Sequence, residues 1–354
     1  MKRLKRAVCI LLALCSLLLA ADHLRRSPIP EGAGIAVHFI DIGQGDCSLV
    51  VCDGRYLLID GGAPAASSTV YSYLKKYNIT HLDYVVCSHP HDDHCGGLAG
   101  ALSFATVSVA MCPVTDHDSR AFRSFQKKLT EQGVRLTVPK VGDSFWLGQA
   151  EVTVLGPVNK DGAELNDLSI VLRVVYGETS FLFTGDAELA EETDLLRKHD
   201  SLQSTVLKIG HHGSAGSTGE AFLQQVAPSY AVISVGKGNA YGHPTEQTLS
   251  RLKSEGCTVL RTDLHGDIVF ASDGKTVTYE VEKNRSVNPF AELHATESET
   301  AEAGVYIINT NSKKFHLTTC AQARNISADH KLTRTVDRET LIAEGYSPCG
   351  SCKP

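Results

Sequence analysis

The chain has 354 residues, of which 42% are hydrophobic and 21% charged, which allows one core of about 250 residues plus a small accessory module. Its formal net charge is -6, so no global basic field favours a protein that coats nucleic acid without catalysis. A nuclease is not excluded, because metal ions can supply the positive charge that phosphate chemistry needs.

Residues 1–27 predict an export signal. Four basic residues within the first six positions precede an apolar run from Ala7 to Ala21, which is shorter than the roughly 20 residues of a membrane span and suits a signal segment. Leucines precede Ala20 and Ala21, where a cleavage site needs small residues. We therefore expect a secreted or extracytoplasmic protein, with the segment either cleaved or kept as a membrane anchor. The alternative is the buried first helix of a cytosolic protein.

Residues 35–282 predict an α+β domain. Short segments rich in β-branched or aromatic residues and bounded by Gly or Asp predict strands at 36–40, 47–52, 56–59, 82–87, 151–155, 170–175, 180–183, 232–235, 258–261, 267–270 and 276–279. Helical periodicity predicts helices at 67–77, with Val70, Leu74 and Tyr77 on one face, and at 218–226 and 245–254. Strand-rich groups with interspersed helices predict an αββα sandwich, in which two sheets lie between outer helices.

The chain beyond this domain changes character. Residues 283–304 hold Asn288-Pro289 and several glutamates among small polar residues, which predicts an acidic linker. Residues 305–354 predict a separate module. The single cysteines lack the spacing of a disulfide scaffold, and most are interpreted as small buried hydrophobes: Cys47, Cys52, Cys87, Cys95, Cys112 and Cys257.

One loop after the predicted strand 82–87 concentrates metal-ligating residue types in the run His89-Pro90-His91-Asp92-Asp93-His94. Histidines one residue apart can bind one cation, while Asp93 and His94 reach a second. Imidazole and carboxylate suit zinc, manganese or iron, and two cations about 4 Å apart can hold a bridging hydroxide. The run therefore predicts a site for two divalent metals rather than a surface loop that happens to be rich in histidine.

This run matches the HxHxDH signature of the metallo-β-lactamase superfamily. More specifically, the chain resembles the hydrolase domain of the competence protein ComEC and its free-standing relatives, over roughly residues 35–282. The stretches that carry the resemblance are 37–46, 58–62, 183–188, 207–214 and 241–244, in that order along the chain.

The resemblance implies a role for each matching residue. The metal ligands would be His89, His91, Asp93, His94, Asp186 and His243. Asp186 would bridge the two metals, and His243 would be the late histidine of the second site. Asp60 and Asn166 would support the ligands from behind. The superfamily usually has a further histidine for the first site, but the stretch 165–169 has none, so that site's third ligand stays open.

His211 and His212 follow a strand-like run and are both candidates for catalysis, together with Asp93. One of the two histidines would ligate a metal or protonate the leaving oxygen, and the other would pack in the core. We favour His212 for the active role. Asn239 and Tyr241 are candidates to line the pocket, although Asn239 is equally suited to a turn. The isolated histidines are interpreted as structural: His38, His81, His117, His199 and His265.

The C-terminal module carries two pairs of ligands, His316 with Cys320 and Cys349 with Cys352. This set suits one tetrahedral structural zinc, and a domain of about fifty residues has little apolar core without a metal. The alternative is one disulfide plus a free thiol. The module resembles the zinc-binding domain at the N-terminus of the DNA-repair protein Ada, with a histidine for the first cysteine. That resemblance implies DNA contact, and a role in folding alone is the alternative.

Several basic residues make this tail locally positive, which favours nucleic acid: Lys313, Lys314, Arg324, Lys331, Arg334, Arg338 and Lys353. We therefore expect an exported phosphodiesterase or nuclease that acts on DNA through a metal-bound hydroxide. The alternatives are a hydrolase of another ester, thioester or lactam, since this fold hosts many chemistries, and a non-catalytic nucleic-acid-binding protein. The sequence indicates no protein partner.

Overall fold

The computed structural model describes residues 27–291, 304–336, 341, 344–349 and 352. The predicted export signal therefore lies outside the described residues. The chain divides into two compact units, one ending at Phe290 and one beginning at Ala291. The predicted linker 283–304 thus begins within the first unit, where the backbone oxygen of Pro289 accepts a hydrogen bond from Arg261 Nη1 at 3.1 Å.

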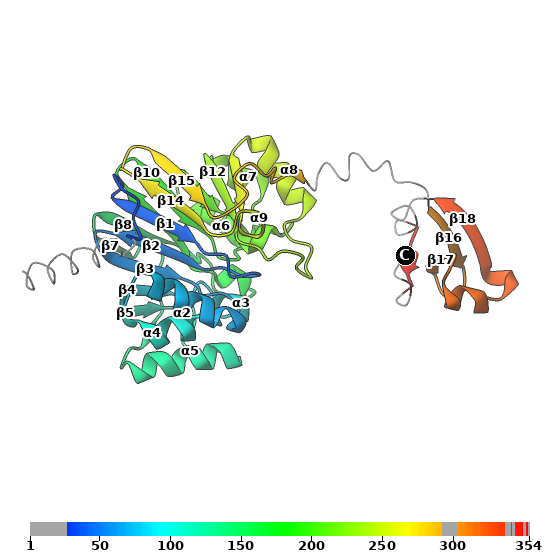
Figure 1. Cartoon of the computed structure of the whole chain (residues 1–354), viewed down its shortest axis with the longest axis horizontal. Coiled ribbons are helices and arrows are strands. Elements are labelled where there is room, and N and C mark those ends of the chain that lie inside the picture. The colour runs from blue at the N-terminus through cyan, green and yellow to red at the C-terminus, as the bar shows by residue number, and fades with distance from the viewer. Residues whose placement is uncertain (1–26, 292–303, 337–340, 342–343, 350–351, 353–354) are drawn as a thin grey trace, which may run out of the picture. The chain divides into compact units, whose positions relative to one another are not determined.

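The first unit is built on two sheets that pack face to face (Figure 1). The order in the first sheet is β15-β14-β1-β2-β3-β4-β5-β6. Its strands are β1 (Ile35–Phe39), β2 (Ser48–Cys52), β3 (Arg55–Ile59), β4 (His81–Val86), β5 (Thr106–Met111), β6 (Leu136–Thr137), β14 (Ile268–Ser272) and β15 (Val277–Val281).

The second sheet has the order β13-β12-β11-β10-β9-β8-β7. Its strands are β7 (Ser144–Leu147), β8 (Ala150–Gly156), β9 (Val171–Tyr176), β10 (Thr179–Phe183), β11 (Val206–Lys208), β12 (Tyr230–Ile233) and β13 (Thr258–Arg261). The strands from β10 to β13 run parallel, as do those from β3 to β6.

Helices cover the outer faces of both sheets (Figure 1), which confirms the predicted αββα arrangement. Those on the first sheet are α2 (Ser67–Lys76), α3 (Asp92–Cys95), α4 (Leu98–Phe104) and α5 (Arg120–Glu131). Those on the side of the second sheet are α6 (Leu189–Lys198), α7 (Glu220–Val226), α8 (Glu246–Glu255) and α9 (Thr262–His265). None of the helices among the described residues combines the length and apolar character that a membrane span requires.

Strand β2 is largely apolar because both of its faces are buried. All five of its residues are buried. Because side chains alternate between the faces of a sheet, Leu49 and Val51 join the core beneath the helices, whereas Val50 and Cys52 join the core between the sheets. A strand covered on both faces therefore reads as a continuous hydrophobic run.

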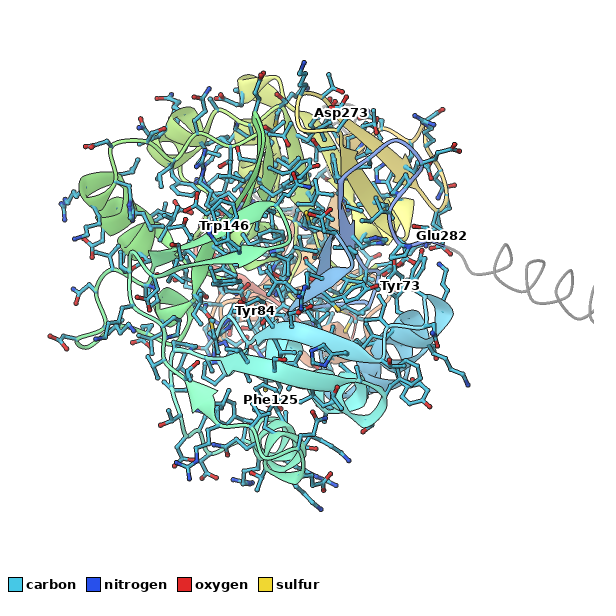
Figure 2. All side chains as sticks on the ribbon, turned by 90° about the vertical axis from the view of Figure 1, so that its left-hand side faces the viewer. Tyr73, Tyr84, Phe125, Trp146, Asp273 and Glu282 are labelled. Atoms are coloured by element: carbon cyan, nitrogen blue, oxygen red, sulfur yellow. The ribbon has the colours of Figure 1, made fainter. Side chains whose placement is uncertain are left out.

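One helix differs from its prediction, and another was not predicted. The helix predicted at 67–77 ends at Lys76. Tyr73, labelled in Figure 2, is buried together with Val70 and Leu74, while Tyr77 follows the helix and is only partly buried. Helix α5 was not predicted. Its N-terminus is capped by Ser119, whose hydroxyl accepts a hydrogen bond from the Phe122 amide at 3.0 Å.

Other elements also fall where no prediction was made, among them α4, β5, β6, β7 and α6. Most of the single cysteines are buried, as predicted. Cys47, Cys52, Cys87, Cys95 and Cys112 are buried free thiols, and Cys257 is a free thiol that is half-buried.

The second unit contains a four-stranded sheet in the order β18-β16-β17-β19. Its strands are β16 (Gly304–Asn309), β17 (Lys314–Leu317), β18 (Lys331–Val336) and β19 (Ser347–Pro348). The apolar core of this unit centres on Ile308, Phe315 and Leu341 among the described residues. So small a core gives a domain little stability of its own.

Candidate metal centre

The predicted ligands follow the carboxyl ends of strands in both sheets. The loop 87–94 leaves β4, Asp186 follows β10, and the turn at Gly210–Gly213 follows β11. Because neighbouring parallel strands end at the same edge of a sheet, these loops meet at one end of the sandwich. Residues far apart in the sequence are thereby brought to one place.

Four imidazoles converge on one carboxylate oxygen, Oδ2 of the buried Asp186. Its distance to Nε2 of His94 is 3.2 Å and to Nε2 of His212 is 3.5 Å. The Nε2 atoms of His211 and His89 lie 3.8 and 3.9 Å away. The structure therefore places Asp186 at the centre of the histidine cluster, as expected of a bridging ligand.

The other predicted ligands of the loop lie on two sides of this centre. His91 Nδ1 is 2.9 Å from His89 Nε2, so these two rings form one side. Asp93 Oδ2 is 3.4 Å from His212 Nε2, and Asp93, His94 and His212 offer ligand atoms within 4.8 Å of one another. His94 also groups with His89 and Asp186, so the division of the loop's ligands between two cations stays a prediction.

His243 was predicted to belong to the second site. Its ring lies 5.4 Å from that of His211 between centroids and lines the same pocket. Among the described residues, however, it belongs to none of the groups of ligand atoms that approach within 4.8 Å. His212 stands beside Asp93 and His94, and the assignment of His243 to the second site stays a prediction.

Hydrogen bonds behind the histidines fix which nitrogen faces the centre. Asp60 Oδ2 lies 2.9 Å from His94 Nδ1, and the Asp60 carboxylate itself accepts hydrogen bonds from the amide and hydroxyl of Ser88, both at 2.7 Å. His89 Nδ1 lies 3.2 and 3.4 Å from the hydroxyls of Ser88 and Ser169. With Nδ1 held from behind, Nε2 of each ring points toward Asp186.

A buried ion pair supports His212. Lys208, only 1% exposed, places Nζ 2.6 Å from Asp46 Oδ2 and donates a hydrogen bond to the Ile209 carbonyl at 2.7 Å. Asp46 Oδ1 lies 3.2 Å from His212 Nδ1, which also lies 3.0 Å from the Ser234 carbonyl. Neither Asp46 nor Lys208 was predicted to have a role, although Lys208 interrupts the apolar run Val206-Leu207-Lys208-Ile209.

The turn that carries both late histidines has an uncommon backbone. His211 and His212 have φ values of 46° and 53°, and Gly213 follows with φ 87°. Consecutive residues other than glycine in the left-handed region cost energy and persist only where surrounding contacts enforce them. Here the turn directs both imidazoles toward Asp186.

Nearby carboxylates raise the pKa values of two histidines at the centre. Burial by itself lowers the pKa of His212, but the carboxylates of Asp186, Asp46 and Asp93 outweigh it and raise that pKa to about 9. The pKa of His94 is likewise raised well above its ordinary value, against the effect of burial, by Asp186 and Asp60. Carboxylates that hold protons on neighbouring imidazoles also attract a cation that can replace those protons.

The donor set fits divalent cations. Among the described residues, the buried side-chain atoms without a hydrogen-bond partner include His94 Nε2, His212 Nε2, His243 Nδ1 and Asp186 Oδ1. Such orphaned atoms are costly unless a ligand satisfies them. Imidazole nitrogens and carboxylate oxygens of this kind bind zinc or manganese, and a bridging carboxylate between two groups of donors suits a pair of metals.

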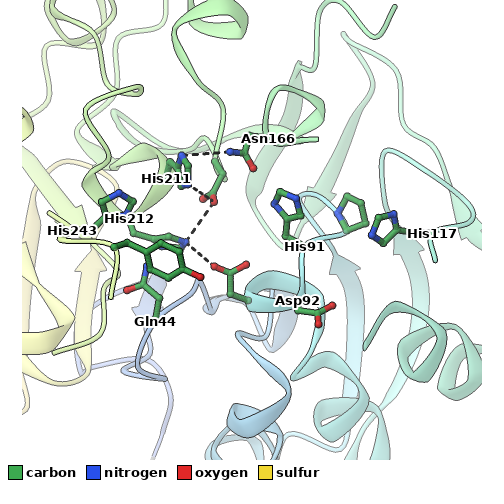
Figure 3. A pocket seen from close by; sticks show the side chains of 12 residues that line it. Gln44, His91, Asp92, His117, Asn166, His211, His212 and His243 are labelled. Carbon is green, nitrogen blue, oxygen red and sulfur yellow. Dashed lines mark hydrogen bonds and ion pairs between the residues drawn. The ribbon is translucent and has the colours of Figure 1, made fainter. Parts of the chain in front are cut away.

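An open pocket of about 400 Å³ leads to the centre. Figure 3 shows His91, His211, His212 and Asn166 facing this space, and Gln44 and His117 at its rim. The loop after β5 brings the His117 ring to the pocket, where it also packs edge-on against Phe122, so its structural interpretation stays a prediction. None of the 12 described residues that line the pocket is a lysine or an arginine.

His211 is held from behind in a different way from His212. Glu188 Oε1 lies 2.9 Å from His211 Nδ1, and Asn166 Nδ2 donates a hydrogen bond to the same oxygen at 3.1 Å. The His211 side chain remains 26% exposed, whereas that of His212 is 2% exposed. Asn166 thus contacts Glu188 and His211, and of the two late histidines of this turn His211 is the more accessible from the pocket.

The C-terminal unit brings its four predicted ligands together. His316, Cys320, Cys349 and Cys352 offer ligand atoms within 4.8 Å of one another. The cysteines are free thiols, and the Leu317 amide donates a hydrogen bond to Cys352 Sγ at 3.5 Å. This arrangement has the donor set of a structural zinc site.

Comparisons with known proteins identify a family and several relatives. The model of the metallo-beta-lactamase superfamily matches residues 40–237. The chain is 33% identical over 263 residues to ComE operon protein 3 of Bacillus subtilis (strain 168), which covers 69% of this chain and 34% of that protein. It is 35% identical over 248 residues to Competence protein ComA of Neisseria gonorrhoeae, which covers 70% of this chain and 33% of that protein.

A third relative is Recombination protein 2 of Haemophilus influenzae, which is 30% identical over 237 residues, with 66% of this chain and 28% of that protein covered. The chain therefore spans about a third of the length of the curated relatives that it matches.

Proposed function

The chain belongs to the metallo-β-lactamase superfamily and is a metal-dependent hydrolase of its ComEC-like group, and we propose that its substrate is the phosphodiester backbone of DNA. The observation that carries this proposal is the convergence of four imidazoles on Asp186 Oδ2 at the base of an open polar pocket. The names of the relatives, which refer to competence and to recombination, favour DNA over other esters.

We assign the ligands from the geometry. His89 and His91 would hold one divalent cation and Asp93, His94 and His212 a second, with Asp186 between them. Zinc and manganese both suit this set. When bound, the cations would polarise the phosphoryl oxygens and lower the pKa of a water molecule at the site.

The remaining chemistry falls to His211. Its Nδ1 is anchored by Glu188 at 2.9 Å, its ring faces the pocket, and its Nε2 is 3.8 Å from Asp186 Oδ2. An imidazole held in this way can deliver a proton to the leaving oxygen of a phosphodiester. We therefore propose His211 as the general acid and His212 as a ligand. In the buried His212, Nδ1 contacts Asp46 and the Ser234 carbonyl, while Nε2 faces Asp186.

The test is hydrolysis by residues 28–354, loaded with manganese or zinc, of single-stranded and double-stranded DNA, a lactam and a thioester. We expect DNA to be cleaved and His91→Ala to lose both cleavage and bound metal. His81→Ala is the matched control, because His81 is an exposed histidine on β4 that hydrogen-bonds Thr106 and Ser108 outside the pocket. Turnover of the lactam or thioester alone would establish the alternative hydrolase. DNA binding without cleavage, unaffected by His91→Ala, would establish a non-catalytic binder.

We also propose a structural zinc on His316, Cys320, Cys349 and Cys352, and contact between the C-terminal unit and DNA. The support for zinc is the approach of one imidazole and three thiols beside a core of very few apolar residues. The support for DNA contact is the basic character of exposed residues such as Lys313, Lys314 and Lys331, which can neutralise phosphates.

Export through residues 1–27 remains part of the proposal, with or without membrane anchoring. A fusion of residues 1–34 to a reporter enzyme that is active only outside the cytoplasm tests it. We expect reporter activity from this fusion and none from a version with Lys2, Arg3, Lys5 and Arg6 deleted together with the apolar run.

A further inference from the structure

A single aromatic side chain stands at the rim of the pocket. Tyr241 lines the pocket and is 69% exposed. Of the aromatic side chains in the described parts of the chain, Tyr241 and Trp146 are the two that are exposed. An isolated exposed aromatic residue needs no functional explanation by itself. A role for Tyr241 must therefore be argued from the contacts of its loop and its ring.

The loop 236–243 that carries Tyr241 is tied together by one side chain. Asn239 Nδ2 donates hydrogen bonds to the carbonyls of Gly236 and His243, at 3.0 and 2.6 Å. Asn239 Oδ1 accepts from the amides of Tyr241 and His243, both at 3.1 Å. Gln44 Oε1 accepts a further bond from the Gly236 amide at 3.1 Å. The loop is thus ordered in advance, and a ligand that contacts Tyr241 loses little free energy in fixing it.

The Tyr241 ring also has a defined orientation toward the centre. It stacks on His243 with ring centroids 5.8 Å apart and an angle of 26° between the planes. His243 in turn meets His211 edge-on, at 5.4 Å and 79°. A row of rings therefore leads from the general acid proposed above to the rim, and most of the last ring's surface remains open to solvent.

We propose that Tyr241 is a stacking platform for a base of a single-stranded nucleic acid whose phosphodiester lies at the metal centre. This inference rests on the proposed function and adds the form of the substrate. Stacking suits a strand of any sequence because every base has a π-face. A base in a duplex is already stacked on both sides, so the platform favours single strands. Lys237, exposed on the same loop, offers a cation for a neighbouring phosphate.

The experiment compares Tyr241→Ala, Tyr241→Phe and Trp146→Ala on two oligonucleotides of equal length, one complete and one with abasic sites flanking the cleaved bond. Trp146 is a matched control, because it is an aromatic residue on β7 that is 65% exposed and lies outside the pocket (Figure 2). Hydrolysis gives KM and kcat. Fluorescence anisotropy of the metal-loaded protein, with strands whose cleaved bond is replaced by a phosphorothioate that resists hydrolysis, gives binding without cleavage.

We expect Tyr241→Ala to raise KM and weaken binding of the complete strand about tenfold, within the range measured for loss of one base stack. The same change should leave the abasic strand unaffected, and Tyr241→Phe and Trp146→Ala should match the wild type. An equal loss on both strands, no loss on either, or no binding by the parent protein would overturn the platform. Tight binding that depends on Tyr241, but without hydrolysis by the wild type, would overturn the proposed nuclease and keep the platform.

Discussion

The buried charges behind His212 show how single residues maintain the centre. Lys208 and Asp46 are fully covered, and their charged atoms are 2.6 Å apart. A buried pair of this kind contributes little when compared with apolar residues, but breaking it leaves an uncompensated charge in the interior. The pair therefore holds His212 in place only while both partners are present.

We predict that Lys208→Met lowers the free energy of unfolding by about 3 kcal/mol, because the buried Asp46 then loses its lysine partner and keeps only the contact with His212. Adding Asp46→Asn should recover part of that loss, which a double-mutant cycle measured by urea unfolding would show. Lys283→Met is the control. Lys283 lies 3.5 Å from Asp41 and is half exposed, so its loss should cost no more than about 1 kcal/mol. Equal effects of the two lysine substitutions would contradict the prediction.

Some residues of the centre were predicted from a local pattern, and others, such as Asp60 and Asp186, only from the resemblance to a family. The six-residue run 89–94 was recognisable because its ligands are adjacent in the chain. His117 and Asp46 acquire their roles only through contacts with distant loops. No spacing rule links Asp46 to Lys208 or to His212, so their association was not available from the pattern of residues.

The spacing of apolar residues in the sequence predicts some of the buried strands and helices but not all of them. The strands around the centre were predicted because runs such as 48–52 are buried on both faces. Helix α5 was missed although its apolar positions have helical spacing, with Ala121, Phe122, Phe125 and Leu129 buried on one side. Charged residues fill its other side, which is typical of a helix that covers a sheet.

The contact between β1 and α2 depends on an uncharged histidine. His38 lies on β1, with Nδ1 2.9 Å from the Tyr73 hydroxyl and Nε2 2.7 Å from the Pro28 carbonyl. Its ring also meets Tyr77 edge-on. Burial, together with the charge of Lys76, lowers the pKa of His38 from 6.5 to about 4, although the hydrogen bond to Pro28 opposes the shift.

We predict that this contact makes stability fall on acidification. Between pH 6.5 and about pH 4 the unfolded chain binds a proton at His38 that the folded chain does not, so the free energy of unfolding falls as the pH is lowered, by roughly 3 kcal/mol in all. His38→Gln keeps a polar side chain without this titration. Urea unfolding across the same range should show a shallower pH dependence for His38→Gln, while His81→Gln, at an exposed site, should follow the wild type. Parallel curves for all three would count against the assignment.

At the scale of the whole molecule, the chain forms two units with separate cores. The first has extensive cores between the sheets and beneath the helices. The second has a core of a few residues and a group of four metal-ligand side chains. We therefore expect the two units to differ in how strongly their folding depends on metal.

We predict that Cys320→Ser removes one equivalent of zinc and unfolds the C-terminal unit, while the first unit keeps its thermal transition and its hydrolysis of short oligonucleotides. Elemental analysis and calorimetry on the full chain would measure both effects. Cys257→Ser is the control, because Cys257 is a half-buried free thiol of the first unit and its change should leave zinc content intact. A C-terminal unit that stays folded without zinc would refute the structural role.

The sequence alone determined the class of fold, the metal-binding loop and the two-part organisation. Each of these is encoded in neighbouring residues, through the period of apolar side chains or the spacing of ligands. The tertiary structure decided which histidine stands beside Asp93, that His117 reaches the pocket and that Lys208 neutralises Asp46. Local patterns specify which side of an element is buried, but which distant groups meet there depends on how both sheets and their loops pack together.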